Sequence, residues 1–405
     1  MKKKCLFVIN TLSRAGAETA LLELLRKLSP ERFDVSLFVL TAQGEMVSEL
    51  PPYVQLLNKD YDSTSVLVRA GKRKLLKKVL RSLCARGTVI RLFPYLLRNL
   101  RKMPGRGSAN AEKLLWRVLS DGAPRWDRSY DLAVAYLEGG STYYVADHVK
   151  ADKKAAFVHI DYTMAGYTRA LDLDCYRKMD KIFAVSDEVR SRFLEIYPEH
   201  ELKLEVFHNI LNVSEIRRKS RLAGGFTDNY NGTRLLTVAK LAAQKALDIS
   251  IEAMKLLKDA GGRFRWYVLG EGEQRSYLER KIRGLELTED FILCGAADNP
   301  YPYFAQTDLY VHASRFEGKS IAIQEAQILE CAVLASDCSG NRENVSDGED
   351  GKLCPFTPEG IRDGILWLMA HPEARAQYAK AAGQKYKDQA SGADKLLSLV
   401  GGNGG

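Results

Sequence analysis

Two glutamates stand out in the segment SRFEGKSIAIQEAQILECAV, residues 314–333. Glu317 precedes a glycine in a predicted loop, whereas Glu325 lies inside a predicted helix. The helical period places Glu325 on the face that carries Ile321 and Ile328, which should be buried. A carboxylate on a buried face is costly unless a partner pairs with it. Glu325 therefore needs either an internal Arg or Lys or a bound ligand.

Cations and backbone N–H groups should lie near these glutamates. The helix is predicted to begin near Ser320, so the N–H groups of Gly318, Lys319 and Ser320 would be free. The dipole of that helix favours an anion at the same place. Lys240 and Lys245 flank the turn after the predicted strand RLLTVAK and can neutralise the same anion. A diphosphate is the natural ligand for such a site.

Polar side chains also follow predicted strands in the first half of the chain. His159 ends the strand in FVHIDYT and is followed by Asp161 and Tyr162, while Glu138 and Gly139 close DLAVAYL. A lone histidine is more often a core residue. At the carboxyl end of a parallel strand, however, it is a candidate for orienting or polarising reacting groups. The other four residues are candidates to line the same edge of the sheet.

Predicted strands and helices alternate regularly along the chain. Runs such as CLFVIN, VSLFVL, RLLTVAK and LYVHAS are apolar on both faces, as strands of a helix-covered parallel sheet should be. Amphipathic stretches such as ETALLELLRKL and LDISIEAMKLLKDAG lie between them. Repeated β-α-β units of this kind predict a doubly wound α/β fold.

The alternation of strands and helices is interrupted at residues 209–233, where no strand is predicted and Gly, Asn and Ser accumulate. We place a boundary near residue 212, which gives two similar Rossmann-like domains, 1–212 and 213–405. The first is expected to carry a basic helical insertion at about residues 65–125. Two such domains facing each other create a cleft at the carboxyl ends of their sheets. We also expect the last helix to pack back on the N-terminal domain.

The chain contains the motifs SRFEGKSIAIQEA with SDCSGNRENVSDGEDGKL, VAKLAAQKALDISIEA, VLGEGEQRSYLE, VFHNILNVSEIR, AVSDEVRSRF and LSRAGAETALLELL. These motifs resemble those of the retaining GT-B glycosyltransferases of family 4, of the type that builds bacterial capsular polysaccharides and exopolysaccharides. The resemblance covers the chain except about residues 60–125. The resemblance implies an N-terminal acceptor domain and a C-terminal nucleotide-sugar-binding domain.

The resemblance also implies roles for individual residues. Glu325 would hold the ribose hydroxyls of the nucleotide, which are the partners that a buried carboxylate needs. Glu317 and His159 would lie beside the donor sugar as catalytic-site residues. The acceptor side would be lined by Glu138, Gly139, Asp161 and Tyr162. Gly16 would let the backbone approach donor phosphate or acceptor.

The chain departs from the family pattern at two positions. Ala15 stands where the family has the first glycine of a pair. Lys240 stands where the family usually has arginine, which keeps the charge but loses the bidentate fork.

We therefore expect a retaining hexosyltransferase-type enzyme that moves a sugar from a nucleotide diphosphate donor, UDP-linked, to a saccharide or lipid-linked saccharide acceptor. Since no carboxylate pair typical of a double displacement stands out, we expect front-face departure of the diphosphate. A nucleotide-sugar epimerase on a related fold and a non-catalytic sugar- or nucleotide-binding scaffold remain alternatives.

No metal or cofactor is assigned. Two D-x-D strings occur, at residues 60–62 and 172–174, but neither follows a convincing strand. The lysine pair and the helix terminus can carry the phosphate charge instead. Seven dispersed cysteines without a C-x-x-C pair argue for a reducing compartment and against structural zinc. The short apolar run after MKKK is too short for a signal peptide, so we expect a cytoplasmic protein.

One segment is strongly basic. The net charge is +9, yet residues 65–111 contain thirteen Lys and Arg and no Asp or Glu. Cations interleaved with Leu, Val, Ile and Phe suit the surface of an anionic leaflet. Nucleic acid is a rival partner, although few aromatic residues are available for stacking, and a solvated helical hairpin is another reading. We expect residues 69–106 to dock on the inner face of the cell membrane, and no nucleic acid partner.

Overall fold

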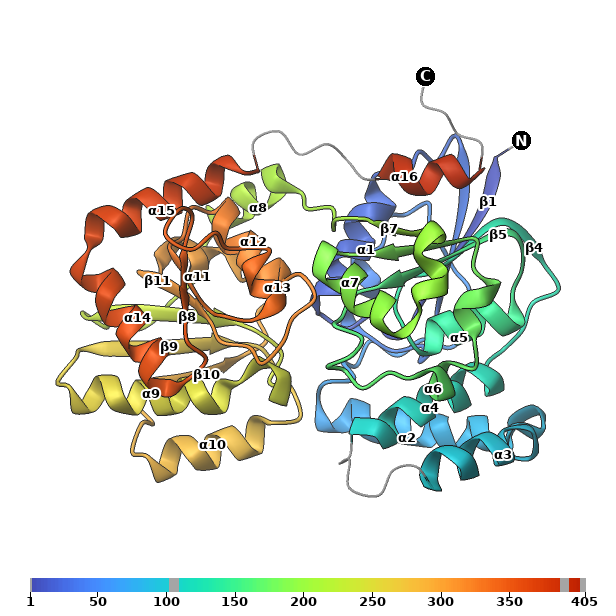
Figure 1. Ribbon diagram of the computed structural model, residues 1–405, viewed down its shortest axis with the longest axis horizontal. Helices are drawn as coiled ribbons and strands as arrows, with labels where there is room; N and C mark the ends of the chain where they lie inside the picture. The colour runs from blue at the N-terminus through green and yellow to red at the C-terminus, as the bar shows by residue number, and fades with distance from the viewer. Residues whose placement is uncertain (1, 102–108, 387–392, 401–405) are drawn as a thin grey trace. The chain divides into compact units, whose positions relative to one another are not determined.

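The computed structural model of the protein describes residues 2–101, 109–386 and 393–400 (Figure 1). The chain forms two units, Met1–Ile210 with Ser391–Gly405, and Leu211–Ala390. The division lies within two residues of the predicted boundary near 212. The last described α-helix, α16 (Ala393–Leu397), belongs to the first unit.

The first unit is built on a parallel sheet. Among the described residues, seven strands pair in the order β3-β2-β1-β4-β5-β6-β7, each parallel to its neighbours. Their bounds are β1 (Lys3–Ile9), β2 (Phe33–Val39), β3 (Gln55–Leu56), β4 (Ser129–Ala135), β5 (Lys150–Val158), β6 (Lys181–Ala184) and β7 (Leu204–Val206).

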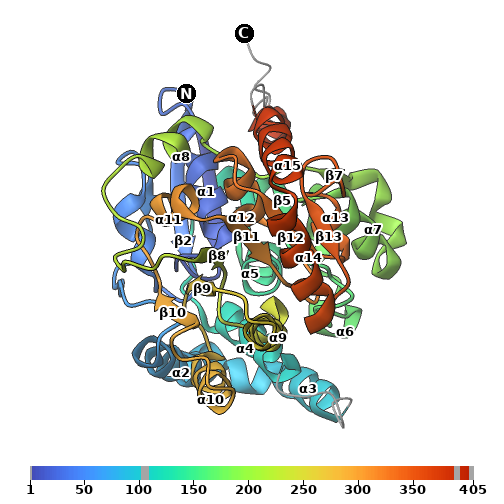
Figure 2. The same ribbon diagram turned by 90° about the vertical axis from the view of Figure 1, so that its left-hand side faces the viewer.

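Helices connect these strands. They are α1 (Gly16–Arg26), α5 (Gly140–His148), α6 (Arg169–Asp172) and α7 (Asp187–Ile196). Between β3 and β4 the chain adds α2 (Arg69–Cys84), α3 (Thr88–Arg101) and α4 (Ala109–Gly122), which lie together in both views (Figures 1 and 2). The described part of the basic segment is therefore mainly helical, and its residues 102–108 lie outside the described part.

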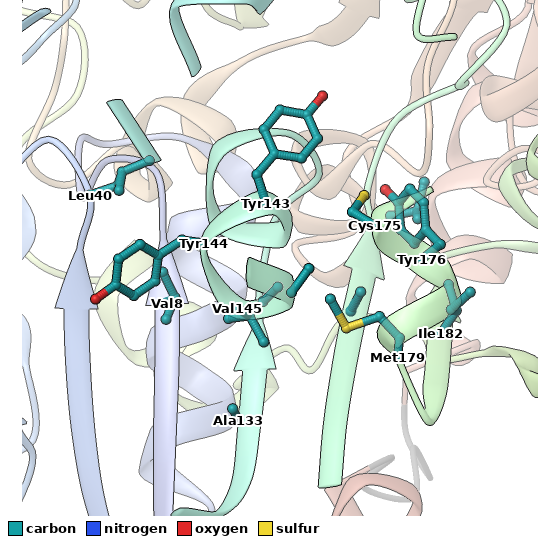
Figure 3. Close-up of a cluster of buried hydrophobic side chains, with 14 of the residues drawn as sticks. Val8, Leu40, Ala133, Tyr143, Tyr144, Val145, Cys175, Tyr176, Met179 and Ile182 are labelled. Carbon is teal, nitrogen blue, oxygen red and sulfur yellow. The ribbon is translucent and has the colours of Figure 1, made fainter. Parts of the chain in front are cut away.

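The core of the first unit lies between the sheet and its helices. In β1, Cys5 to Ile9 are all buried, which explains why the run is apolar on both faces. Figure 3 shows Val8 of β1 and Ala133 of β4 near Tyr144 and Val145 of α5. Burying each such large apolar side chain contributes about 2 kcal/mol.

The second unit repeats this architecture with six described strands in the order β10-β9-β8-β11-β12-β13, again all parallel. The strands are β8 (Thr233–Val238), β9 (Phe264–Leu269), β10 (Phe291–Gly295), β11 (Leu309–His312), β12 (Val333–Ser336) and β13 (Lys352–Cys354). The helices are α8 (Val213–Ser220), α9 (Leu247–Asp259), α10 (Arg275–Gly284), α11 (Tyr301–Gln306), α12 (Ile321–Ile328), α13 (Ser339–Arg342), α14 (Pro358–Ala370) and α15 (Pro372–Gln384). The predicted class, two doubly wound Rossmann-like domains, is confirmed.

Candidate functional site

Glu317 lies in the loop between β11 and α12 and is buried. Its Oε1 atom accepts hydrogen bonds from Lys245 Nζ at 2.5 Å, Ser314 Oγ at 2.5 Å and His312 Nε2 at 3.0 Å. Lys245 ends a short 3₁₀ turn after β8, and β8 pairs with β11. The carboxyl ends of two adjacent strands thus bring the cation and the carboxylate together, as expected of a parallel sheet.

The contacts around Glu317 determine the protonation states of Glu317 and His312. Burial alone would raise the pKa of Glu317, but Lys245 and His312 outweigh it and hold that pKa well below its usual range. Burial lowers the pKa of His312, so its ring is neutral at pH 7. A neutral ring that donates from Nε2 to Glu317 accepts at Nδ1 from the Tyr310 hydroxyl, 3.0 Å away. Glu317 is therefore a fixed, ionised carboxylate.

Glu325 has a different environment. It is buried on α12, and its Oε1 accepts a hydrogen bond of 2.9 Å from the hydroxyl of Tyr301, the first residue of α11. Burial raises the pKa of Glu325 to about 7, although the Tyr301 bond and the charge of Lys219 oppose it. No Lys or Arg of the described chain forms an ion pair with Glu325. An internal cation is thus not its partner, and the carboxylate is only partly compensated.

The start of α12 lies between the two glutamates. Ser320 caps the helix, since its side chain accepts from the Ile323 N–H. Among the described residues, the backbone N–H groups of Gly318 and Ser320 have no hydrogen-bond acceptor, which leaves them available to an anion. Lys319 lies between them and is half-buried.

Lys240 is not part of the Glu317 cluster. It follows β8, its side chain is exposed, and its Nζ lies 3.8 Å from Glu273. The structure therefore brings together Lys245, Glu317 and the start of α12, with Lys240 on the exposed side of the same strand end.

A glycine that the sequence reasoning did not single out holds this loop. A Cβ atom on Gly340 of α13 would lie 2.4 Å from the Gly318 carbonyl oxygen and 2.6 Å from the Glu317 Cβ. Only glycine fits there without displacing the loop. The quoted motif SDCSGNRENVSDGEDGKL contained Gly340, but its contact could not be read from spacing.

In the first unit, His159 and Glu138 lie at the ends of the neighbouring strands β5 and β4. The backbone N–H of His159 donates to the Glu138 carboxylate at 3.0 Å. Burial lowers the pKa of His159 to about 3 and raises the pKa of Glu138. The His159 ring packs beside Tyr136, with ring centroids 5.1 Å apart, and its buried Nε2 has no hydrogen-bond partner among the described residues. A neutral imidazole with an unused nitrogen is suited to a ligand hydroxyl.

The remaining predicted residues of this unit have structural contacts. Asp161 is buried, and its Oδ1 accepts the Met164 N–H at 2.9 Å. Tyr162 is fully buried and donates its hydroxyl to Asp172 at 2.9 Å. This contact places Tyr162 in the core rather than on an acceptor surface. The reason is that the chain turns immediately after β5 and carries the ring inward.

Two glycines mark helix starts in the first unit. Gly139 has a φ of +76° and precedes α5, a conformation that favours glycine. Gly16 is the exposed first residue of α1, after Ala15 in an extended conformation. Glu18, in the first turn of α1, is buried and accepts a hydrogen bond from Thr11 at 2.8 Å.

One aspartate of each D-x-D string makes side-chain contacts within the protein. Asp62 pairs with Lys74 at 2.5 Å. Asp172 is buried and accepts hydroxyl hydrogen bonds from Tyr143, Tyr162 and Tyr197. Within residues 2–101, 109–386 and 393–400, no group of three His, Cys, Asp or Glu side chains is arranged to hold a metal ion. No helix in these ranges is both long and apolar enough to cross a bilayer.

Comparison with known families gives a match over most of the second unit. Residues 227–385 match the family model described as "Glycosyl transferases group 1". This range contains Lys240, Lys245, Glu317 and Glu325.

Two curated proteins illustrate the relatives. The chain is 29% identical over 223 residues to the N-acetylgalactosamine-N,N'-diacetylbacillosaminyl-diphospho-undecaprenol 4-alpha-N-acetylgalactosaminyltransferase of Campylobacter jejuni, covering 55% of this chain and 58% of that protein. It is 29% identical over 149 residues to the amylovoran biosynthesis glycosyltransferase AmsK of Erwinia amylovora, covering 35% of this chain and 37% of AmsK. The chain thus spans between a third and two thirds of the length of these relatives.

Solved structures match nearly the whole chain. Anabaena HepE in complex with UDP has a TM-score of 0.64 and 15% identity, with 99% of this chain and 100% of that one covered. The S. aureus TarM G117R mutant, in complex with fondaparinux, alpha-GlcNAc-glycerol and UDP, has a TM-score of 0.66 and 11% identity, with 99% and 100% covered. The chain therefore has the GT-B fold of glycosyltransferases, and its residues 227–385 match the glycosyl transferases group 1 domain.

Proposed function

We propose that this protein is a retaining glycosyltransferase of family 4. It transfers a sugar from a UDP-linked donor to a saccharide or lipid-linked saccharide in the synthesis of a cell-surface polysaccharide. The observation that carries this proposal is the contrast between two buried glutamates on either side of one helix start. Glu317 is fully compensated by Lys245, whereas Glu325 has only a tyrosine hydroxyl as a partner. A ligand that donates hydrogen bonds would therefore stabilise Glu325 more than Glu317.

In this proposal the second unit binds the nucleotide. The ribose hydroxyls donate to Glu325, and the diphosphate lies at the N–H groups that begin α12. Because Lys245 is already paired with Glu317, its charge is partly offset. The exposed Lys240 and the helix start therefore supply much of the phosphate binding, with Lys319 beside them. Relatives support the choice of nucleotide, since HepE and TarM were both solved with UDP.

The chemistry follows from the state of Glu317. A carboxylate that accepts three hydrogen bonds on one oxygen and has a strongly lowered pKa is a weak nucleophile. It is better suited to orienting the donor sugar and stabilising the positive charge that develops on its ring. We propose front-face departure of the diphosphate and attack by an acceptor hydroxyl on the same face, which gives retention. His159 of the first unit is the proposed residue that orients the reacting groups.

We also propose two features of the reaction's setting. No metal ion or cofactor is required, because the helix start and the lysines carry the phosphate charge. The protein associates peripherally with the anionic inner face of the cell membrane through the basic helices α2 and α3. The undecaprenol-linked acceptor in the name of the Campylobacter relative supports a membrane-bound acceptor.

A thermal-shift panel of UDP- and GDP-sugars tests the donor assignment. Saturation at 100 times the dissociation constant stabilises a protein by about 2.7 kcal/mol, which shifts its Tm measurably. We expect UDP-sugars to raise the Tm, and donor turnover to require an acceptor and to persist in EDTA. Conversion of donor without acceptor would indicate an epimerase. Binding without turnover under any acceptor would indicate a scaffold, and no shift with any donor would contradict the nucleotide-sugar site.

A further inference from the structure

Exposed apolar side chains are concentrated on the helices between β3 and β4. Of the fourteen exposed large hydrophobic residues in the described chain, eight lie between Val68 and Leu115. Ile90 is 80% exposed and Phe93 59%, while Leu76 is 58% and Leu80 55% exposed. Scattered apolar residues are normal on a protein surface, but a concentration of this kind marks a binding face.

Five of these residues are spaced along one side of the helix that carries them, three on α3 and two on α2. On α3, Ile90, Phe93 and Leu97 are spaced as neighbours on one side of the helix. The side that packs on the protein is different and carries Leu92 and Tyr95, which are both buried. A helix that is apolar on a second face needs a second apolar environment.

The second helix follows the same pattern with charges at its edge. Leu76 and Leu80 of α2 lie one turn apart, while Val79 packs inward. Arg73 and Lys77 lie on the flank of the Leu76–Leu80 face, and both are exposed without an ion pair to any described carboxylate. Two other described cations of the segment are paired, Lys74 with Asp62 and Arg91 with Asp121.

The two helices are held firmly on the first unit. The Tyr95 hydroxyl of α3 donates to the Leu171 carbonyl at 3.0 Å, and Tyr95, Leu114 and Leu171 share a small apolar core. Leu171 belongs to α6, in the segment that follows His159 and Asp161 along the chain. The exposed face is therefore a fixed surface of the folded unit rather than a loose hairpin.

We propose that α2 and α3 form a lipid-insertion surface, made by Leu76, Leu80, Ile90, Phe93 and Leu97. These five side chains enter the interfacial region of an anionic bilayer, while Arg73 and Lys77 remain at its headgroups. The inference rests on the membrane association proposed above and deepens it, because binding then depends on immersed apolar side chains as well as on charge. A nucleic acid would match the cations but would leave the aliphatic side chains in water.

Vesicle flotation with the full-length chain separates these contributions. The double variant Ile90→Ser/Phe93→Ser keeps every charge, and Leu202→Ser is its matched control, because Leu202 is fully exposed outside the surface. On phosphatidylcholine vesicles containing phosphatidylglycerol, we expect the double variant to bind at least roughly tenfold more weakly than wild type, since one such side chain contributes about that factor. The control should bind like wild type. The variant Arg73→Gln/Lys77→Gln should lower the salt dependence of binding.

Fluorescence reports insertion directly. Tryptophan placed by Phe93→Trp should shift its emission to shorter wavelength on anionic vesicles and be quenched by brominated lipid, whereas Leu202→Trp should do neither. All variants should match the wild-type unfolding curve, because the substituted side chains are exposed.

The outcomes distinguish the inference from the proposals beneath it. Unchanged affinity of Ile90→Ser/Phe93→Ser, with binding abolished by salt, would overturn insertion and leave charge-driven docking intact. Absence of wild-type binding at low salt would overturn docking and insertion together, while the donor thermal shift tests the transferase independently. Displacement from vesicles by an oligonucleotide duplex, with the apolar variants unaffected, would assign the surface to nucleic acid.

Discussion

The different environments of Glu317 and Glu325 indicate different tasks for these two residues. The sequence placed Glu325 on a buried helix face, and the structure confirms its burial. Its protein partner could not be predicted, because Tyr301 lies on α11, whose approach to α12 depends on the packing of the whole unit. The same holds for Ser314 and His312, which reach Glu317 across a loop that has no regular period.

Glu325→Gln tests the ribose role and has a definite pH dependence. The pKa of Glu325 is raised to about 7 in the folded protein, so wild-type stability should fall as pH rises from the unfolded pKa of about 4.5 to above 7. The cost reaches at most about 3 kcal/mol, and the neutral amide avoids it. We expect the variant to be more stable than wild type at pH 8, equally stable near pH 4, and to bind UDP about tenfold more weakly. Urea unfolding and UDP titration at both pH values measure these effects, and unchanged UDP affinity would refute the ribose contact.

Lys245→Met tests the opposite case, in which a buried charge loses its partner. Glu317 would then remain buried with only neutral donors, at a cost of about 3–5 kcal/mol. The double variant Lys245→Met/Glu317→Gln removes both charges and should recover much of this loss. A double-mutant cycle by urea unfolding gives the coupling energy, and additive single effects would show that the ion pair is not a structural unit.

At the element scale, strands were easier to predict than their connections. Runs such as CLFVIN are buried on both faces, so their apolar character is continuous and unambiguous. Tyr162 illustrates the limit. It follows β5 as a candidate acceptor residue should, yet the local turn directs its ring into the core, where it stacks on Tyr167 with ring centroids 4.7 Å apart. The direction of a loop side chain is set by tertiary contacts, which the period of a strand does not contain.

The contact between α13 and the Glu317 loop gives a prediction at this scale. Gly340→Ala would place a methyl group 2.4 Å from the Gly318 carbonyl oxygen, so the loop must move. We expect a stability loss of about 1–3 kcal/mol and a larger loss of donor affinity, because the displaced backbone begins α12. Gly284→Ala is the control, since a Cβ there meets no atom within 4 Å and its φ is unstrained. A Gly340→Ala protein that bound UDP like this control would show that the loop position is unimportant for the nucleotide.

For the molecule as a whole, the domain boundary and the uneven charge distribution could both be recognised in the sequence, for the same reason. Both are departures from an average, one in the β-α rhythm near residue 212 and one in the thirteen cations of residues 65–111. The last helix was also predicted from the sequence to pack on the N-terminal domain, and α16 belongs to the first unit. Its physical basis is visible only in the fold, where Lys395 donates to the Val206 carbonyl at 2.9 Å and pairs with Glu205.

In the basic segment, the sequence does not predict which apolar side chains are exposed. Leu75 and Leu76 are adjacent and chemically identical, and Val79 and Leu80 are adjacent and chemically similar. Residue type alone therefore cannot predict which residue of each pair is exposed. The distinction depends on how α2 packs against α4, which leaves Leu76 and Leu80 outside and Val79 inside. A solvated hairpin and a lipid-insertion surface therefore have the same sequence signature. In a lipid-insertion surface, the leucines that do not pack on the protein share one helix face, and unpaired cations flank that face. In this chain Leu76 and Leu80 are arranged in this way.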